Sequence, residues 1–129
     1  MQTPRPVPHD PSAHLVVYSA AFKPFCPALL AGFAKAHPGV TLQFVDGVST
    51  DLHTQYLGLH QRGEGLPDVI WSSAMDLQMA LVRMGHARPH RSAHAQALPA
   101  WARYQDVAFC TTLEPLVGLR HTQYLGPQE

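Results

Sequence analysis

The feature that most constrains the fold is the stretch over residues 68–84, DVIWSSAMDLQMALVRM. Residues 69–71 form a short apolar run with high strand propensity, and the serine pair Ser72 and Ser73 follows at once. The apolar residues that come next have the spacing of one helix face: Leu77, Ala80, Leu81 and Met84. Ser73 and Asp76 have the spacing of a capping box, so we expect this serine to begin the helix.

The same sequence of apolar strand, serine turn and helix is predicted near the start of the chain. Residues 15–18, LVVY, are a continuous apolar run, as expected of a strand buried on both faces of a parallel sheet. Ser19 and Ala20 begin the turn after it, and residues 27–36 are predicted to form a helix. The buried stripe expected on that helix consists of Leu29, Leu30, Phe33 and Ala34.

A third strand followed by a helix is predicted between these two segments. Residues 40–44 alternate between apolar and polar side chains, which predicts a half-buried strand near a sheet edge. Ser49 or Thr50 is expected to cap the next helix, with Asp51 in its first turn, where the helix dipole favours an acid. The apolar stripe expected on this helix consists of Leu52, Tyr56 and Leu59.

The remainder of the chain is less regular. Residues 86–104 are expected to be a loop with a short helical turn, and residues 107–112 and 116–119 are expected to be short strands. Strands and helices thus alternate three times before these extended segments. This alternation predicts an α/β fold of three layers with a mostly parallel sheet.

Composition excludes several classes of function. The 129 residues are enough for one domain, and their formal net charge is zero, so neither a nucleic-acid partner nor a polybasic membrane surface is expected. Residues 1–14 are rich in proline and are expected to be a disordered lead-in without the apolar core of a secretory signal. Cys26 and Cys110 lack the spacing of a zinc site. They are either two small buried residues or, in an oxidising compartment, a disulfide.

Polar side chains follow all three predicted early strands: Ser19, Asp46, Ser49, Thr50, Ser72 and Ser73. If the strands are adjacent and parallel, the turns that follow them meet at one edge of the sheet. They would offer hydroxyl and backbone N–H groups without any cationic side chain, which suits a phosphate, phosphonate or carboxylate. The alternative is that these residues are three ordinary helix caps, and the spacing does not decide between the two.

Other chemistry is weakly indicated. His86, His90 and His94 have the spacing of metal ligands on a helix, but Pro89 would break that helix, which favours loop histidines without a metal. Ser72 lacks the G-x-S-x-G surroundings of an activated serine nucleophile. We therefore expect no enzymatic activity, no cofactor and no metal ligands.

Residues 15–125 resemble the first lobe of bacterial periplasmic solute-binding proteins of ABC transporters, in particular the ferric-iron/phosphate-ester type. The resemblance rests on LVVYSA, AKAHPGV, STDL, DVIWSSAMDLQMALVRMG and ALPAWARYQDVAFCTTLEPLVGLRH. It implies one lobe of a type II periplasmic-binding fold, in which residues 126–129 begin the crossing to a second lobe. Because this sequence shows neither a signal or lipid anchor nor that lobe, we expect a truncated lobe.

The resemblance also implies a function. Such proteins are periplasmic and monomeric, bind a small anionic solute or ferric ion, and deliver it to an ABC permease. Alternatively, some relatives act as ligand-sensing modules that present a bound phosphorylated solute to a membrane sensor. The ligand-facing positions that the resemblance carries over are Ser19, Ala20, Ser49, Thr50, Ser72, Ser73, Thr112 and Glu114.

Overall fold

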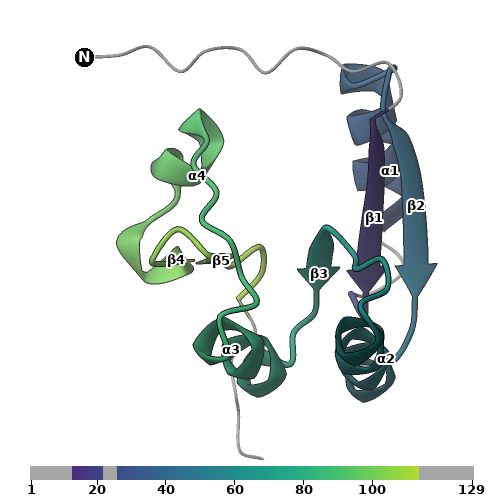
Figure 1. The fold of residues 1–129 in the computed structure, drawn as a ribbon. Helices are drawn as coiled ribbons and strands as arrows, with labels where there is room; N and C mark the ends of the chain where they lie inside the picture. Colours follow the sequence, from purple (N-terminus) through teal and green to yellow (C-terminus); the bar gives the residue numbers. More distant parts are fainter. Residues whose placement is uncertain (1–12, 22–25, 114–129) are drawn as a thin grey trace, which may run out of the picture. The chain divides into compact units, whose positions relative to one another are not determined.

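A computed structural model of the chain describes residues 13–21 and 26–113 (Figure 1). The chain divides into two compact units, Met1–Ala87 and Arg88–Glu129. The predicted strand over residues 116–119, Glu114 and the expected start of an interlobe crossing lie outside the described residues.

The first unit contains a parallel sheet of three strands, as the alternation of elements predicts. The strands are β1 (His14–Ser19), β2 (Thr41–Asp46) and β3 (Val69–Trp71), in the order β2-β1-β3. β1 is the central strand and buries Val17, Tyr18 and Ser19. β2 lies at an edge and has an alternating exposure pattern, as its sequence predicts.

Three helices follow the three strands, as predicted. They are α1 (Cys26–Ala36), α2 (Ser49–Arg62) and α3 (Met75–Arg83). α2 buries Leu52 and Tyr56, both on its predicted apolar stripe.

The predicted helix caps are wrong for both α2 and α3. The residues that precede the two helices are Val48 and Ala74, and neither makes a hydrogen bond with its side chain. Ser49 is already helical, and Ser73 stands two residues before α3 begins. The hydroxyl that bonds in this turn is that of Ser72, whose Oγ accepts the N–H of Ala74 at 3.1 Å, and this bond lies before α3 begins.

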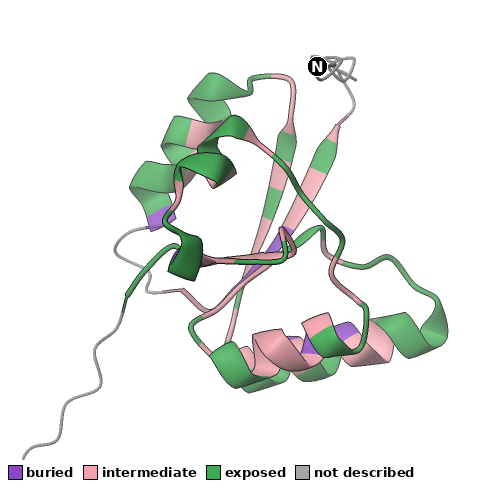
Figure 2. Ribbon diagram, turned by 90° about the vertical axis from the view of Figure 1, so that its left-hand side faces the viewer, coloured by how far each residue is buried: buried purple, intermediate pink, exposed green. Residues whose placement is uncertain are grey.

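The expected buried stripe of α1 is wrong in part. Cys26 is the buried residue of this helix, whereas Leu29 is 56% exposed. Figure 2 shows that exposed and half-buried residues make up most of the helical ribbon. Leu30 and Phe33 are half-buried, and Ala34 is exposed. A sheet of three strands, one of them only three residues long, offers little surface to cover a helix of 11 residues. The amphipathic pattern therefore predicts the helix correctly but overstates its burial.

α2 and α3 approach one another at their carboxyl ends through three rings. The hydroxyl of Tyr56 lies 3.0 Å from Nδ1 of His86, which follows α3. The rings of His60 and His86 meet edge to face, with centroids 4.3 Å apart. Burial raises the pKa of Tyr56 above its ordinary value, because it disfavours the charged phenolate.

The second unit is built from short elements. These are α4 (Ala93–Ala97), a 3-10 turn (Ala100–Ala102), β4 (Arg103–Tyr104) and β5 (Ala108–Phe109). The two strands form an antiparallel hairpin whose turn places Gln105 and Asp106 at positive φ. The expected loop with a short helical turn is confirmed, but the strand expected over residues 107–112 is much shorter.

Truncation of Leu52 tests the core of the first unit. Leu52 is 5% exposed, so Leu52→Ala is expected to lower the free energy of unfolding by about 2–5 kcal/mol, because it removes buried methyl groups and leaves a cavity. Urea unfolding followed by circular dichroism measures this change. The matched control is Leu29→Ala, which changes the same side chain on the exposed face of α1 and is expected to cost about 0.5 kcal/mol or less. Equal losses for the two variants would contradict the arrangement of the core.

Candidate functional site

The carboxyl ends of the three parallel strands meet at one edge of the sheet. Ser19, the last residue of β1, pairs in register with Asp46 of β2 and Trp71 of β3. Two backbone bonds extend this contact, because the N–H of Gly47 donates to the Ser19 carbonyl (3.0 Å) and the N–H of Ala20 donates to the Trp71 carbonyl (2.9 Å). The prediction that the three turns meet at one edge is confirmed. We call this region the strand edge.

Ser19 forms the interior of the strand edge. It is fully buried, and its Oγ accepts the N–H of Ala21 at 3.1 Å while its carbonyl accepts that of Gly47. These bonds fix the direction in which the chain leaves β1. Ala20, the next residue, is half-buried. A ligand contact by Ser19 or Ala20 stays a prediction.

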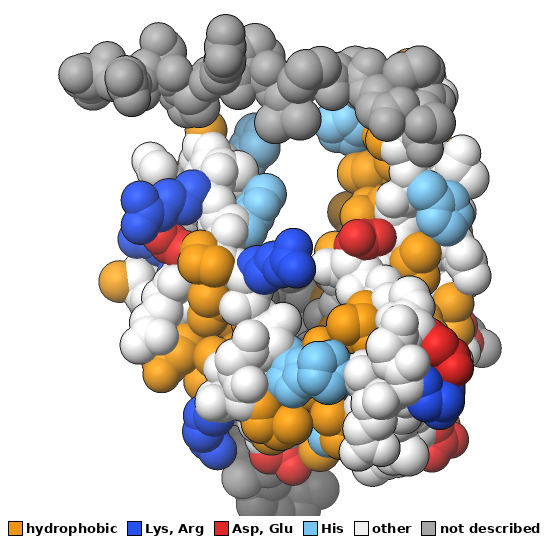
Figure 3. All heavy atoms as spheres, in the orientation of Figure 1, with side chains coloured by type: hydrophobic (Ala, Val, Ile, Leu, Met, Phe, Trp, Pro, Cys, Tyr) orange, Lys and Arg blue, Asp and Glu red, His pale blue; other side chains and the backbone are white. Residues whose placement is uncertain are grey.

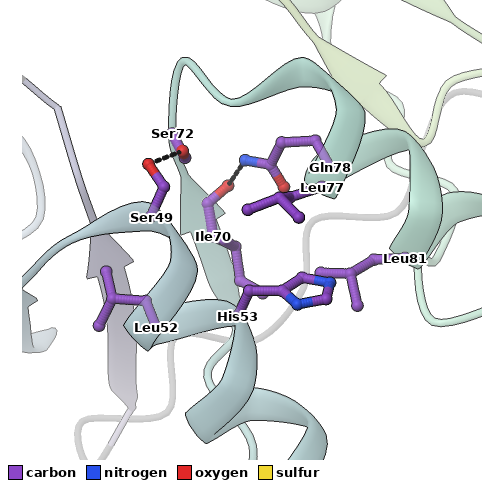
Figure 4. A pocket seen from close by; sticks show the side chains of 8 residues that line it. All are labelled: Ser49, Leu52, His53, Ile70, Ser72, Leu77, Gln78 and Leu81. Carbon is purple, nitrogen blue, oxygen red and sulfur yellow. Dashed lines mark hydrogen bonds between the residues drawn. The ribbon is translucent and has the colours of Figure 1, made fainter.

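Ser49 and Ser72 form a direct pair at the strand edge. Their Oγ atoms lie 2.8 Å apart, and either hydroxyl can be the donor (Figure 4). Ser49 is the first residue of α2, and Ser72 directly follows β3, so this bond joins the starts of two segments that are 23 residues apart. The Oγ of Ser72 also accepts the N–H of Ala74. This hydroxyl therefore holds both neighbouring turns in place.

The other predicted positions are more exposed. Thr50 is exposed, and its hydroxyl makes a long contact of 3.5 Å with the carboxylate of Asp51. Ser73 is exposed in the bend before α3. Thr112 is an exposed residue of the second unit, and Glu114 lies outside the described residues.

A small pocket lies between α2 and α3 beside the serine pair. Its lining consists of Ser49, Leu52, His53, Ile70, Ser72, Leu77, Gln78 and Leu81 (Figure 4). The Nε2 of Gln78 donates to the carbonyl of Ile70 at 3.2 Å, whereas Nε2 of His53 is buried without a hydrogen-bond partner in the described part of the chain. The space suits about one water molecule, so the pocket is too small for an organic solute.

His53 and Gln78 line this pocket and are not among the residues predicted from the sequence. The spacing of His53 was informative, because a residue four positions after Ser49 lies on the same face of α2. For Gln78 the spacing gave no such signal, since its amide bonds to the backbone of β3 and this contact depends on how the helix packs on the sheet.

Acidic, basic and apolar side chains are all present at the surface (Figure 3). None of the predicted site residues is a lysine or an arginine. Asp51 and Asp76 occupy the first turns of α2 and α3, where they interact favourably with the helix dipoles. An anion at the strand edge would therefore depend on hydroxyl and N–H donors.

The three histidines with metal-ligand spacing do not share one helix. His86 follows α3 in the first unit, whereas His90 precedes α4 and His94 lies within it, in the second unit. Across residues 13–21 and 26–113, the structure contains no group of three or more His, Cys, Asp or Glu side chains that could hold a metal ion. In the same residues, no helix is both long and apolar enough to cross a membrane.

Comparison with solved structures identifies a similar protein. The chain resembles the substrate binding protein of an ABC transporter from Agrobacterium tumefaciens, with a TM-score of 0.68 and 30% sequence identity. The similarity covers 74% of this chain and 28% of that protein. No family model matches the sequence. No curated protein matches it either.

The comparison supports the predicted class of fold. A parallel sheet of three strands, each followed by a helix, is the arrangement of a single lobe of a periplasmic-binding fold. The chain spans a little over a quarter of the length of the similar protein, 28%. The likeness therefore concerns one lobe and does not by itself specify a ligand.

The serine pair can be tested by a double-mutant cycle. We expect Ser49→Ala to lower the free energy of unfolding by about 0.5–1.5 kcal/mol, and Ser72→Ala to cost more, because Ser72 makes two hydrogen bonds. The double variant is expected to lose less than the sum of the two, since the shared bond is removed only once. Denaturant unfolding of the four proteins provides the measurement.

Ser73→Ala is the matched control for this cycle. Ser73 is exposed and α3 begins at Met75, so its loss is expected to change stability by about 0.5 kcal/mol or less. If Ser73→Ala instead lowers the free energy of unfolding by about 1 kcal/mol or more, Ser73 has the capping role that the sequence predicts. Additive losses at Ser49 and Ser72 would contradict an energetic coupling of the pair.

Proposed function

We propose that this chain is part of the solute-binding component of an ABC-type uptake system. In this proposal, a small anionic solute such as a phosphate ester or a phosphonate, or ferric ion, binds at the strand edge. The observation that carries the proposal is the meeting of three strand ends with the starts of α2 and α3. Ligands of open α/β folds bind at this end of the strands. The similarity to an ABC-transporter substrate binding protein supports the same class of function.

The starts of the two helices favour an oxygen-rich ligand. The first N–H groups of a helix lack the usual partner four residues earlier, and the apolar side chains of Val48 and Ala74 cannot accept them. In α2 the N–H of Asp51 already donates to the Val48 carbonyl, so the proposal concerns the N–H groups before it. Ser49, at the start of α2, adds a hydroxyl beside these N–H groups. Together these donors match the acceptor oxygens of a phosphate, a phosphonate or a carboxylate.

A second surface is needed for high affinity. Small-molecule sites usually bury most of the ligand, whereas the strand edge is a single open surface and its adjoining pocket has room for about one water molecule. Asp51 and Asp76 also oppose an anion at the same helix starts. We therefore propose that Ser49, Thr50, Ser72 and Ser73 provide one wall of the site, and that Thr112 and Glu114 belong to the region that leads to the other wall.

This function needs no chemical step. The hydroxyls of Ser49 and Ser72 bond to each other and, for Ser72, to a backbone N–H, rather than to a histidine that could act as a base. The proposed role is therefore to bind and release a solute in the periplasm, with an ABC permease as the partner that receives it.

Thermal unfolding with a panel of ligands tests the proposal. The panel contains phosphate esters, phosphonates, dicarboxylates and ferric ion. A ligand that binds only the native state raises the unfolding midpoint, so at a concentration of about 100 times Kd it adds about 2.7 kcal/mol of stability. We expect one class of anion to raise the midpoint, and the variant carrying both Ser49→Ala and Ser72→Ala to lose this response.

Thr54→Ala is the control for that experiment. The Thr54 hydroxyl donates to the Thr50 carbonyl within α2, so its loss removes a hydroxyl from the same helix but not from the serine pair. We expect this variant to keep the ligand response. If the serine double variant responds like the unchanged protein, or if no ligand of the panel shifts the midpoint, the proposed site is wrong.

A further inference from the structure

The three rings at the carboxyl ends of α2 and α3 lie far from the strand edge. His60 is 11 residues after Ser49 on the same helix, which places the two residues about 16 Å apart along its axis. A site at His60 and His86 is therefore separate from the proposed solute site.

We propose that His60 and His86 form a two-histidine chelate for a divalent transition-metal ion, with water completing the coordination. Imidazole nitrogen is a preferred ligand of Zn²⁺, Ni²⁺ and Cu²⁺. The two residues come from different elements, since His60 lies in the last turn of α2 and His86 follows α3. A bound ion would join the carboxyl ends of the two segments.

The two rings lie close to the spacing that a shared ion requires. Two imidazoles on one zinc ion, with zinc–nitrogen distances of about 2.1 Å, have ring centroids roughly 4.5–5.3 Å apart. Here the centroids are 4.3 Å apart and the ring planes are inclined by 81°. In this edge-to-face contact the rings lie slightly closer than on a shared ion, so metal binding requires the exposed His60 side chain to turn until one nitrogen of each ring faces the ion.

Tyr56 determines which nitrogen of His86 is available. Its hydroxyl lies 3.0 Å from Nδ1, which leaves Nε2 for the metal. A metal-bound histidine commonly donates its other N–H to an oxygen, which fixes the orientation of the ring. The Tyr56 hydroxyl oxygen can accept that hydrogen bond, and Tyr56 is itself held in place because it is only 5% exposed. Tyr56 is thus a positioning residue for His86.

The surrounding charges favour a cation. Both histidines lie where helix carbonyls have partial negative charge, at the ends of α2 and α3. Arg62, two residues after His60, forms an ion pair with Glu64 through two hydrogen bonds. Arg83 in the last turn of α3 is exposed, so solvent screens its charge.

Titration calorimetry of the full chain with Zn²⁺, repeated with Ni²⁺, tests this site. We expect one ion per chain, and about tenfold or greater loss of affinity in His60→Ala and in His86→Ala, because each variant leaves a single imidazole. Tyr56→Phe is expected to weaken binding by about tenfold without abolishing it, because it keeps the ring and removes the oxygen partner of His86. His60→Gln should bind as weakly as His60→Ala, and because His60 is exposed both variants are expected to fold.

His94→Ala is the matched control, since His94 is an exposed histidine on α4 in the second unit. We expect it to bind both ions like the unchanged protein. The proposal is overturned if the His60 variants retain full affinity, or if His94→Ala loses as much affinity as they do. Equal affinity of Tyr56→Phe and the unchanged protein would overturn the positioning role of Tyr56.

Discussion

The structure of the first unit depends on the parallel pairing of β1 with a strand on each side. β1 bonds to β2 along its whole length and to β3 over its last three residues. Asp68 strengthens the second contact, because its backbone N–H donates to the Val16 carbonyl while its carboxylate accepts the Val16 N–H. The strand edge exists because these two ladders bring the last residues of all three strands to the same level. Each helix start is then positioned by the strand before it.

The hydroxyls at this edge serve the fold as well as the proposed site. The Ser19 hydroxyl is used within its own turn, and that of Ser72 bonds both Ser49 and the turn before α3. Such bonds reduce the freedom of side chains that would have to meet a solute, and preorganised donors bind at a lower entropic cost. The same arrangement explains why helix caps and ligand contacts look alike in the sequence, since both require small hydroxyl residues at the end of a strand.

Hydrophobic periodicity predicted the strands, the helices and the parallel sheet of the first unit, because these depend on local spacing and on general rules of α/β connection. It did not predict which serine would bond to which N–H. Ser72 makes these bonds, and its position relative to Ser49 is set by the pairing of β3 with β1, a contact over a long sequence distance. The exposure of Leu29 was missed for a similar reason, because an amphipathic pattern does not reveal how wide the sheet beneath it is. The contacts of the His86 ring with Tyr56 and His60 were also not predicted, because they join residues that are far apart in the sequence.

The short length of β3 has a consequence for the local stability of the sheet. Val16 and Asp68 are 52 residues apart in the sequence, so their pairing closes a long loop, which costs conformational entropy. The ladder that forms between β1 and β3 contains only three residue pairs. The pairing of β1 with β2 spans a shorter loop and gains six residue pairs. We therefore expect the backbone N–H groups that join β1 and β2 to exchange more slowly than those that join β3 to β1. The strand that carries Ser72 to the strand edge is thus held to the sheet by the shorter of the two ladders.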